Sequence, residues 1–175
     1  METKRTYIIP FATLKDGTHN FEYTIGKSFL SMFENADILD CDVFADIEME
    51  KHSTFMKFNF DLTGTATVVC DRCLENLEIE LDNIADLYVR FGENVGDETD
   101  ETVIISPKEY ELDVAQYIYE YLVLSLPFRC VHEDDDQGNP TCNPEMMKHI
   151  STEEEVPQTD SRWNGLKNIF DNNKQ

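Results

Sequence analysis

Apolar and polar residues alternate over long stretches of the first half of the chain. Between residues 41 and 50 the apolar side chains fall on one face, and acidic ones fall on the other with Phe44 as the exception (Cys41, Val43, Ala45, Ile47, Met49 against Asp42, Asp46, Glu48, Glu50). The pattern resumes between residues 56 and 62, where apolar residues alternate with Lys57, Asn59 and Asp61. Period-two spacing sustained this long predicts an antiparallel sheet with one buried face and one wet face.

Shorter stretches extend this pattern on both sides. Residues 7–9 and 20–25 read as strands, and the turn residues Lys15-Asp16-Gly17 between them predict that they form a hairpin. Gly64 interrupts the pattern, residues 65–69 are β-branched and strand-like, and alternation returns at 77–82 and 87–91. The order predicts a meander or a small barrel and argues against a βαβ fold.

Helical spacing appears in two places, one in each half of the chain. Phe29, Met32 and Phe33 have the spacing of a short helix. Asp113 is a predicted N-cap with Gln116 in capping-box position, and the largely apolar run that follows is closed by Pro127. The sequence therefore predicts one long helix packed on the sheet, and an α+β fold that is mainly antiparallel β.

The chain end changes character. Residues 151–160 are acidic with few apolar neighbours and predict a disordered linker. Beyond them Trp163, Leu166, Ile169 and Phe170 recur at helical spacing. We therefore expect a single β-rich domain over 1–150, an acidic linker over 151–160, and a flexible tail ending in a short amphipathic helix over 161–175. That helix docks either on the domain itself or on a partner.

The charge of the chain limits the kinds of molecule that it is expected to bind. Among 175 residues there are 36 acidic and 14 basic ones, giving a formal net charge of −22. Such a charge disfavours binding to bare RNA or DNA, since phosphate contacts need Lys and Arg, and it suits a basic protein partner; the alternative is that the charge only keeps the protein soluble. No stretch reaches the ~18–20 apolar residues of a membrane helix, and the first residues contain no signal-peptide hydrophobic region. We expect a cytoplasmic protein without membrane association.

The five cysteines carry the most chemical information. In that compartment they read as thiols or metal ligands before disulfides. Cys70 and Cys73 flank two residues at a strand end, where a knuckle can aim both sulfurs at one tetrahedral zinc ion. Cys130, His132 and Cys142 follow much later and offer two ways to complete a structural zinc site. One set is Cys70, Cys73, Cys130 and Cys142, and the other replaces Cys130 by His132.

Other interpretations of the thiols compete with structural zinc. They can be unligated core thiols, a redox pair, or ligands of a catalytic zinc with His132-Glu133 as base. A thioredoxin-like pair, however, should open a helix in a βαβ unit. Cys41 fits the strand alternation and reads as packing. The chain contains no Gly-rich phosphate loop and no GxSxG, so the residues predict no enzyme.

The order of these features resembles one family. "VVCDRCLENLEIEL", "YELDVAQYIYEYLVLSLPFRCVH", a final Cys142 and "SRWNGLKNIF" are similar to the YceD family of large-ribosomal-subunit RNA accumulation proteins, over roughly Gly64 to Phe170. The motif positions carried over are Cys70, Arg72, Cys73, Leu74, Leu126, Pro127, His132 and Cys142. Cys130 departs from the family pattern, and this either favours His132 over Cys130 as the fourth ligand or leaves the site incomplete.

The resemblance implies a non-enzymatic factor that supports accumulation of large-subunit (23S) ribosomal RNA and ribosome biogenesis. Its partner would be a large-subunit ribosomal protein or an rRNA precursor, with Arg72 in the knuckle and Trp163 near the chain end as expected contact residues. Two alternatives remain open at this point. One is a thiol-disulfide oxidoreductase using Cys70 and Cys73, and the other is a zinc-ribbon adaptor with no ribosomal link.

Overall fold

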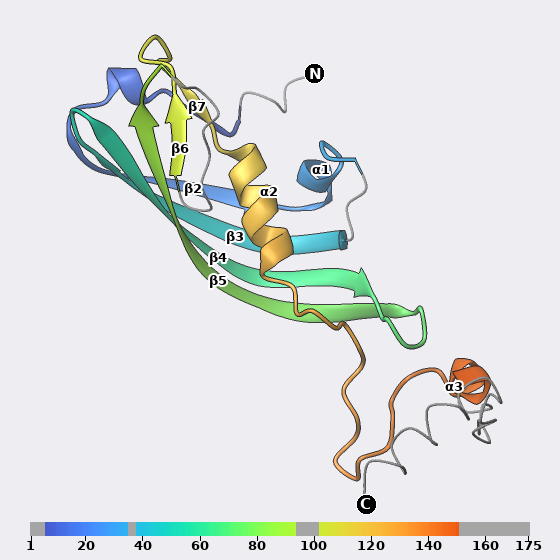
Figure 1. Ribbon diagram of the computed structural model, residues 1–175. Coiled ribbons are helices and arrows are strands. Elements are labelled where there is room, and N and C mark those ends of the chain that lie inside the picture. Colours follow the sequence, from blue (N-terminus) through green and yellow to red (C-terminus); the bar gives the residue numbers. More distant parts are fainter. Residues whose placement is uncertain (1–5, 35–37, 94–101, 151–175) are drawn as a thin grey trace, which may run out of the picture.

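A five-stranded sheet forms the body of the protein (Figure 1). The computed structural model describes residues 6–34, 38–93 and 102–150. The strands follow one another across the sheet in sequence order: β2 (Gly17–Ile25), β3 (Ile38–Lys51), β4 (Phe55–Val69), β5 (Asn76–Phe91) and β6 (Thr102–Ile105). β2 to β5 pair antiparallel, whereas β6 runs parallel to β5. β1 (Ile8–Ile9) and β7 (Leu112–Asp113) form a separate antiparallel pair.

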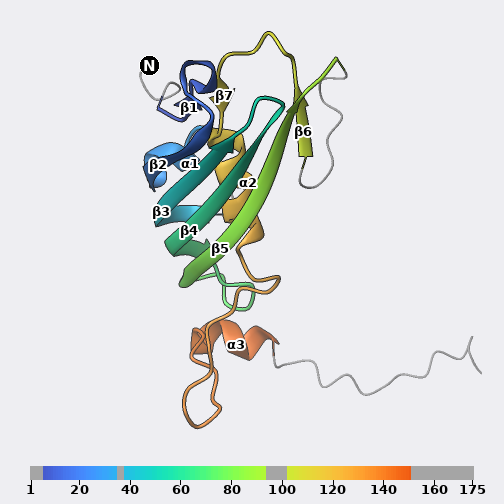
Figure 2. The ribbon, with the colours of Figure 1, turned by 90° about the vertical axis from the view of Figure 1, so that its left-hand side faces the viewer.

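One face of the sheet is buried by helices and the other is open (Figure 2). The helices α1 (Lys27–Leu30) and α2 (Ala115–Leu124) lie on the buried side. The core there consists of apolar strand residues packed under helix residues, among them Ile47, Met49, Phe58, Phe60, Ile118 and Leu122. The intervening strand residues are mostly acidic or polar, as period-two alternation requires.

The mainly antiparallel α+β fold is confirmed, and the sheet is an open meander rather than a barrel. The expected hairpin between residues 7–9 and 20–25 is wrong. β2 instead pairs with β3 along its whole length, from Gly17↔Lys51 to Ile25↔Val43, and β1 pairs with β7. The long partner wins because it satisfies many more backbone hydrogen bonds than a two-residue strand can.

Gly64 does not end a strand, as the sequence suggested, but lies inside β4. It faces Val43 in the register with β3. A Cβ at this position would overlap the carbonyl oxygen of Asp42 and the Cα of Val43. The glycine therefore permits close approach of two backbones in a continuous strand.

The main helix is shorter than expected. α2 has ten residues, and two further short helices are present: the 3-10 turn η2 (Phe11–Thr13) and α3 (Pro144–Ile150). The Oδ1 of Asp113 accepts a hydrogen bond from the backbone N–H of Ala115 at 2.9 Å, but Gln116 bonds Glu120 at 2.7 Å instead of closing a capping box. No helix in the described part of the chain is long and apolar enough to cross a membrane. The linker and terminal-helix predictions for 151–175 lie outside the described residues.

Candidate metal centre

The turn between β4 and β5 holds the first two candidate ligands. Cys70 lies directly after β4, and Cys73 lies three residues before β5 begins. The turn is closed by backbone hydrogen bonds from Cys70 N–H to the Glu75 carbonyl (2.8 Å) and from Leu74 N–H to the Cys70 carbonyl (2.9 Å). Leu74 adopts a positive φ of 61°. This left-handed residue reverses the chain so tightly that both thiols come to lie in one buried cluster.

The chain after α2 is held against this turn by a reciprocal pair of hydrogen bonds. The backbone N–H of Asp71 donates to the Cys130 carbonyl, and the Cys130 N–H donates to the Asp71 carboxylate, both at 2.7 Å. His132 follows two residues later and is thereby carried to the same end of the sheet. Asp71 was not singled out by the sequence, because nothing in the spacing of the cysteines distinguishes it from a solvated turn residue.

A small hairpin then returns the chain to His132. Asp135 organises it by accepting hydrogen bonds from the backbone N–H groups of Gln137 (2.9 Å) and Asn139 (2.7 Å), and Gly138 supplies a positive φ of 80°. The Thr141 hydroxyl closes the hairpin on the Glu133 carbonyl at 2.6 Å. The next residue is Cys142. The distance along the chain between the last two candidate ligands is thus bridged by one locally stabilised turn, in the loop between α2 and α3 (Figure 1).

The structure brings Cys70, Cys73, His132 and Cys142 together, with all four donor atoms within 4.8 Å of one another. The sulfurs of Cys70 and Cys142 are 3.8 Å apart, and His132 Nδ1 lies 3.5 Å from the Cys73 sulfur and 3.7 Å from that of Cys142. A zinc tetrahedron with Zn–S near 2.3 Å and Zn–N near 2.0–2.1 Å has S···S edges of ~3.8 Å and S···N edges of ~3.6 Å. The donor set fits a metal ion of this size.

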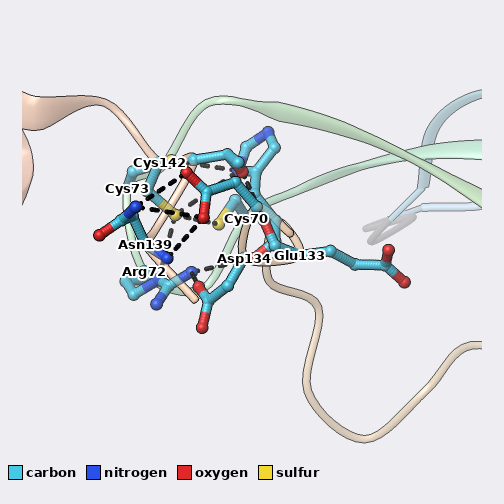
Figure 3. Close-up of polar contacts among 10 residues, drawn as sticks. Cys70, Arg72, Cys73, Glu133, Asp134, Asn139 and Cys142 are labelled. Carbon is cyan, nitrogen blue, oxygen red and sulfur yellow. Dashed lines mark hydrogen bonds and ion pairs between the residues drawn. The ribbon is translucent and has the colours of Figure 1, made fainter. Parts of the chain in front are cut away.

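Two contacts outside the four donors orient them. His132 places its other ring nitrogen, Nε2, 3.2 Å from the Asn76 carbonyl. A proton on Nε2 donated to that carbonyl leaves the Nδ1 lone pair facing the thiols, which is how ligating histidines are commonly held. The Arg72 guanidinium donates to the Cys142 sulfur at 3.1 Å and to the His132 carbonyl at 2.9 Å, and it approaches Asp134 at 3.4 Å (Figure 3).

The three thiols of the cluster are buried, whereas His132 is half-buried. Cys70, Cys73 and Cys142 are each at most 2% exposed and are surrounded by Leu77, Val131, Met146 and Met147. Burial opposes ionisation of Cys70, yet backbone hydrogen bonds from Cys73, Arg72 and His132 outweigh it and lower the pKa of Cys70 to about 6. At Cys142 burial dominates and raises the pKa, although Arg72 acts against it. The surroundings of Cys70 thus favour its thiolate form even without a metal ion.

The other sequence candidates lie elsewhere. The Cys130 thiol donates to the Pro127 carbonyl at 3.5 Å and is not part of the donor cluster. Cys41 is buried in the sheet core, as expected from the alternation. Arg72 has its hydrogen-bond partners inside the centre, and its contact with a partner molecule stays a prediction. Trp163 lies outside the described residues.

An open antiparallel sheet whose end carries a closed cluster of three cysteines and one histidine defines a small β-rich protein with a candidate structural metal centre. The family model described as "Large ribosomal RNA subunit accumulation protein YceD" matches residues 58–170, more than half of the chain, and includes all four donors. The chain belongs to the YceD family. The family description ties it to the RNA of the large ribosomal subunit. No curated protein and no solved structure matches it.

Proposed function

We propose that this protein is a non-enzymatic binding factor that supports accumulation of large-subunit (23S) ribosomal RNA in the cytoplasm, and that its recognition surface is organised by a structural zinc ion. The zinc is held by Cys70, Cys73, His132 and Cys142. The observation that carries the proposal is the convergence of four donors, three of whose mutual distances (3.8, 3.5 and 3.7 Å) are close to the edges of a zinc tetrahedron. The family match supplies the ribosomal context.

The chemistry of the donors favours zinc and a structural role. Thiolate and imidazole groups suit zinc better than magnesium or calcium, which prefer oxygen ligands. Four protein donors complete a tetrahedron and leave no open position for a reacting water, as catalytic zinc requires. An ion there joins the β4–β5 turn to the 130–142 stretch, so its binding free energy becomes folding free energy of this end of the molecule.

The oxidoreductase alternative has less support. Cys70 and Cys73 lie in a turn between two antiparallel strands, not at the start of a helix in a βαβ unit. The donor atoms of His132 and Cys142 lie within 4.8 Å of both thiols of the pair, as expected for ligands of one metal ion. A third thiol and an imidazole at this distance would trap a metal and remove the nucleophilic thiolate that redox exchange needs.

The partner follows from charge. With a net charge of −22 the protein repels phosphate backbones at long range, so we propose that it binds a basic ribosomal protein of the large subunit and supports the RNA through that protein. An rRNA precursor is the second candidate, since Arg72 lies in the centre and Arg129 precedes Cys130, whose backbone is bonded to Asp71.

Metal content tests the first half of the proposal. Purified wild-type protein should hold one zinc per chain by elemental mass spectrometry, and Cys142→Ser should lose it. Cys130→Ser is the matched control, because it changes a nearby thiol outside the donor cluster and should keep the metal. Metal-free wild type whose Cys70 and Cys73 cycle with a dithiol reductant would instead support the oxidoreductase.

Cells lacking the gene test the second half. Expression of wild type should restore the level of 23S rRNA, whereas Cys142→Ser should restore it poorly. Affinity purification at low salt should recover a basic large-subunit protein, and rising salt should weaken its retention because the attraction is between opposite charges. Recovery of RNA without any ribosomal protein would contradict the protein partner and favour direct RNA binding.

A further inference from the structure

Most of β5 has an open edge. β4 pairs with β5 from Phe55↔Arg90 to Val69↔Asn76, but β6 covers its other side only from Tyr88 to Phe91. Within the described residues no other strand pairs with that side between Asn76 and Leu87. An open strand edge presents a row of backbone N–H and C=O groups to any extended chain that can reach it.

A groove of about 580 Å³ runs along this open edge. One wall is formed by four consecutive residues of β5, 77–80, and the other by residues of the 127–133 stretch. Because successive strand side chains point to opposite faces, a hollow that touches four in a row must lie at the strand edge rather than on either face. The volume falls in the ~300–1,000 Å³ range of ligand sites.

The far wall of the groove is held by the candidate metal centre. Cys130, which lines the groove, is fixed to Asp71 by the two 2.7 Å hydrogen bonds described above. His132 follows between the lining residues Val131 and Glu133 and belongs to the donor cluster. The groove is thus a gap between a strand edge and a wall that the metal would lock in place.

The groove walls alternate in character. Leu77 and Ile79 of β5 are partly buried toward the core side, and Pro127 and Val131 add apolar surface to the opposite wall. Glu78 and Glu80 are exposed on the other side of the strand. Glu133 adds a third carboxylate.

The carboxylates of β5 are not neutralised by their neighbours in the sheet. Glu78 and Glu80 stand opposite Thr67 and Thr65 of β4, and no ion pair of the described residues includes either glutamate. Arg129 is the cation among the groove-lining residues. The surface around the open edge therefore offers negative charge on one side and apolar contact on the other.

We propose that this groove binds an extended basic segment of a partner protein, which adds to β5 as a further strand with apolar and basic side chains in alternation. Main-chain hydrogen bonds to the edge would supply affinity, and the alternating walls would supply specificity. The charge of the groove matches the basic partner of the proposed function, on which this inference rests. A nucleic-acid strand is disfavoured there because its phosphates would meet Glu78, Glu80 and Glu133.

A short fluorescent peptide alternating lysine and valine is the probe, titrated against the zinc-loaded full-length protein by fluorescence anisotropy. We expect saturable binding, and we expect Glu80→Arg to weaken it by about tenfold or more. Glu48→Arg is the matched control, because it makes the same charge change at an exposed position of β3 away from the groove. It should change the affinity by less than about threefold. If both variants lost affinity equally, the effect would come from net charge alone, and the proposal that the groove is the binding site would be wrong.

Backbone pairing has its own test. Two versions of the peptide carry N-methyl groups on alternate amides, either on the odd or on the even set. Strand addition predicts that one version loses binding and the other keeps it, since only every second amide of an edge strand faces its neighbour. Equal behaviour of the two versions, or equal binding of a peptide with its lysines and valines in separate blocks, would overturn the strand mode.

Two results would assign the groove to another occupant and contradict the proposal. One is tighter binding by a peptide with this chain's own residues 161–175. The other is a large-subunit RNA fragment whose binding, unlike that of the peptide, responds to Glu80→Arg. Zinc content and 23S rRNA level are measured on the same variants. If the peptide does not bind while zinc content and 23S rRNA level are both retained, the groove proposal is wrong and the proposed function stands. If the peptide binds but the protein holds no zinc or has no effect on 23S rRNA, the proposed function is wrong and the groove still binds the peptide.

Discussion

Leu74 is the one non-glycine residue with positive φ in the described part of the chain. Its φ is 61° and its side chain is 67% exposed, so it contributes little burial in return for the left-handed conformation. A left-handed residue with a Cβ costs roughly 1–2 kcal/mol. Leu74→Gly should therefore raise the free energy of unfolding by about 1 kcal/mol and Tm by a few degrees. Thermal unfolding followed by circular dichroism measures this.

The control for Leu74 lies on the strand side of the same turn. Val69→Gly removes a side chain in the β region, where glycine costs about 0.5–1 kcal/mol, and should lower Tm. Zinc content should be the same in both variants. A lower Tm for Leu74→Gly would mean that its exposed side chain packs on something that matters more than the backbone strain.

Cys41 should make stability depend on alkaline pH. Burial, with Asp40 and Asp42 nearby, raises the pKa of its thiol to about 11, and the thiol faces the Ile25 carbonyl at 3.6 Å. A raised acid pKa means that the unfolded chain ionises first, so stability present below pH ~9 is lost as the pH rises toward 11. The loss should reach about 2 kcal/mol. Cys41→Ser cannot ionise in this range, and its urea midpoint should fall less steeply. Parallel curves for the two proteins would contradict this assignment.

At the residue scale, the three thiols of the candidate centre could be foreseen, but the fourth member of the donor cluster could not be fixed from the residues alone. Cys70, Cys73 and Cys142 follow from spacing and from the chemistry of zinc. The choice between Cys130 and His132 depends on which side chain turns inward. That is decided by the hydrogen bonds between Asp71 and Cys130, which orient the Cys130 backbone toward the turn and leave its thiol outside the cluster.

At the scale of elements, the start of α2 separates two ways of capping a helix. The sequence predicts a capping box between Asp113 and Gln116, whereas the structure uses only Asp113, which accepts from the Ala115 N–H. Asp113→Ala should therefore cost about 1 kcal/mol of unfolding free energy. Gln116→Ala should cost a few tenths, the worth of its side-chain pair with Glu120. Urea titration of both variants measures the difference. Equal losses of unfolding free energy would support the capping box that the sequence predicted.

The pairing of the long strands was predictable, whereas the pairing of the short strands was not. β3 and the first half of β4 could be foreseen because the alternation at 41–50 and 56–62 leaves one register that buries most of their apolar side chains, with Phe44 as an exposed exception. β1 and β7 have two residues each, and β6 has four, so their pairing is set by where the longer elements leave room. The parallel pairing of β6 with β5 carries no local signal in the sequence.

At the scale of the whole molecule, the protein has two separate buried clusters. The larger one lies between the sheet and the helices, and the smaller one contains Cys70, Cys73 and Cys142. Leu77 packs against both clusters and so connects them. The larger cluster is made of apolar side chains, and the hydrophobic effect is sufficient to stabilise it. The smaller one has three thiols, one imidazole and few apolar neighbours, so we expect it to depend on the proposed zinc ion for its stability.

Removal of the metal should therefore unfold one end of the protein and spare the rest. After chelation, backbone amides held in the 130–147 stretch, such as those of Cys130, Asp135 and Met147, should lose protection from hydrogen exchange. Amides that pair β3 with β4 should keep theirs, because their protection depends on the apolar core. Hydrogen-exchange mass spectrometry of the protein with chelator and with zinc-saturated chelator measures both regions at once. Loss of protection throughout β3 and β4 would mean that the two clusters fold as one unit, and the zinc would then stabilise the entire fold and not only the wall of the groove.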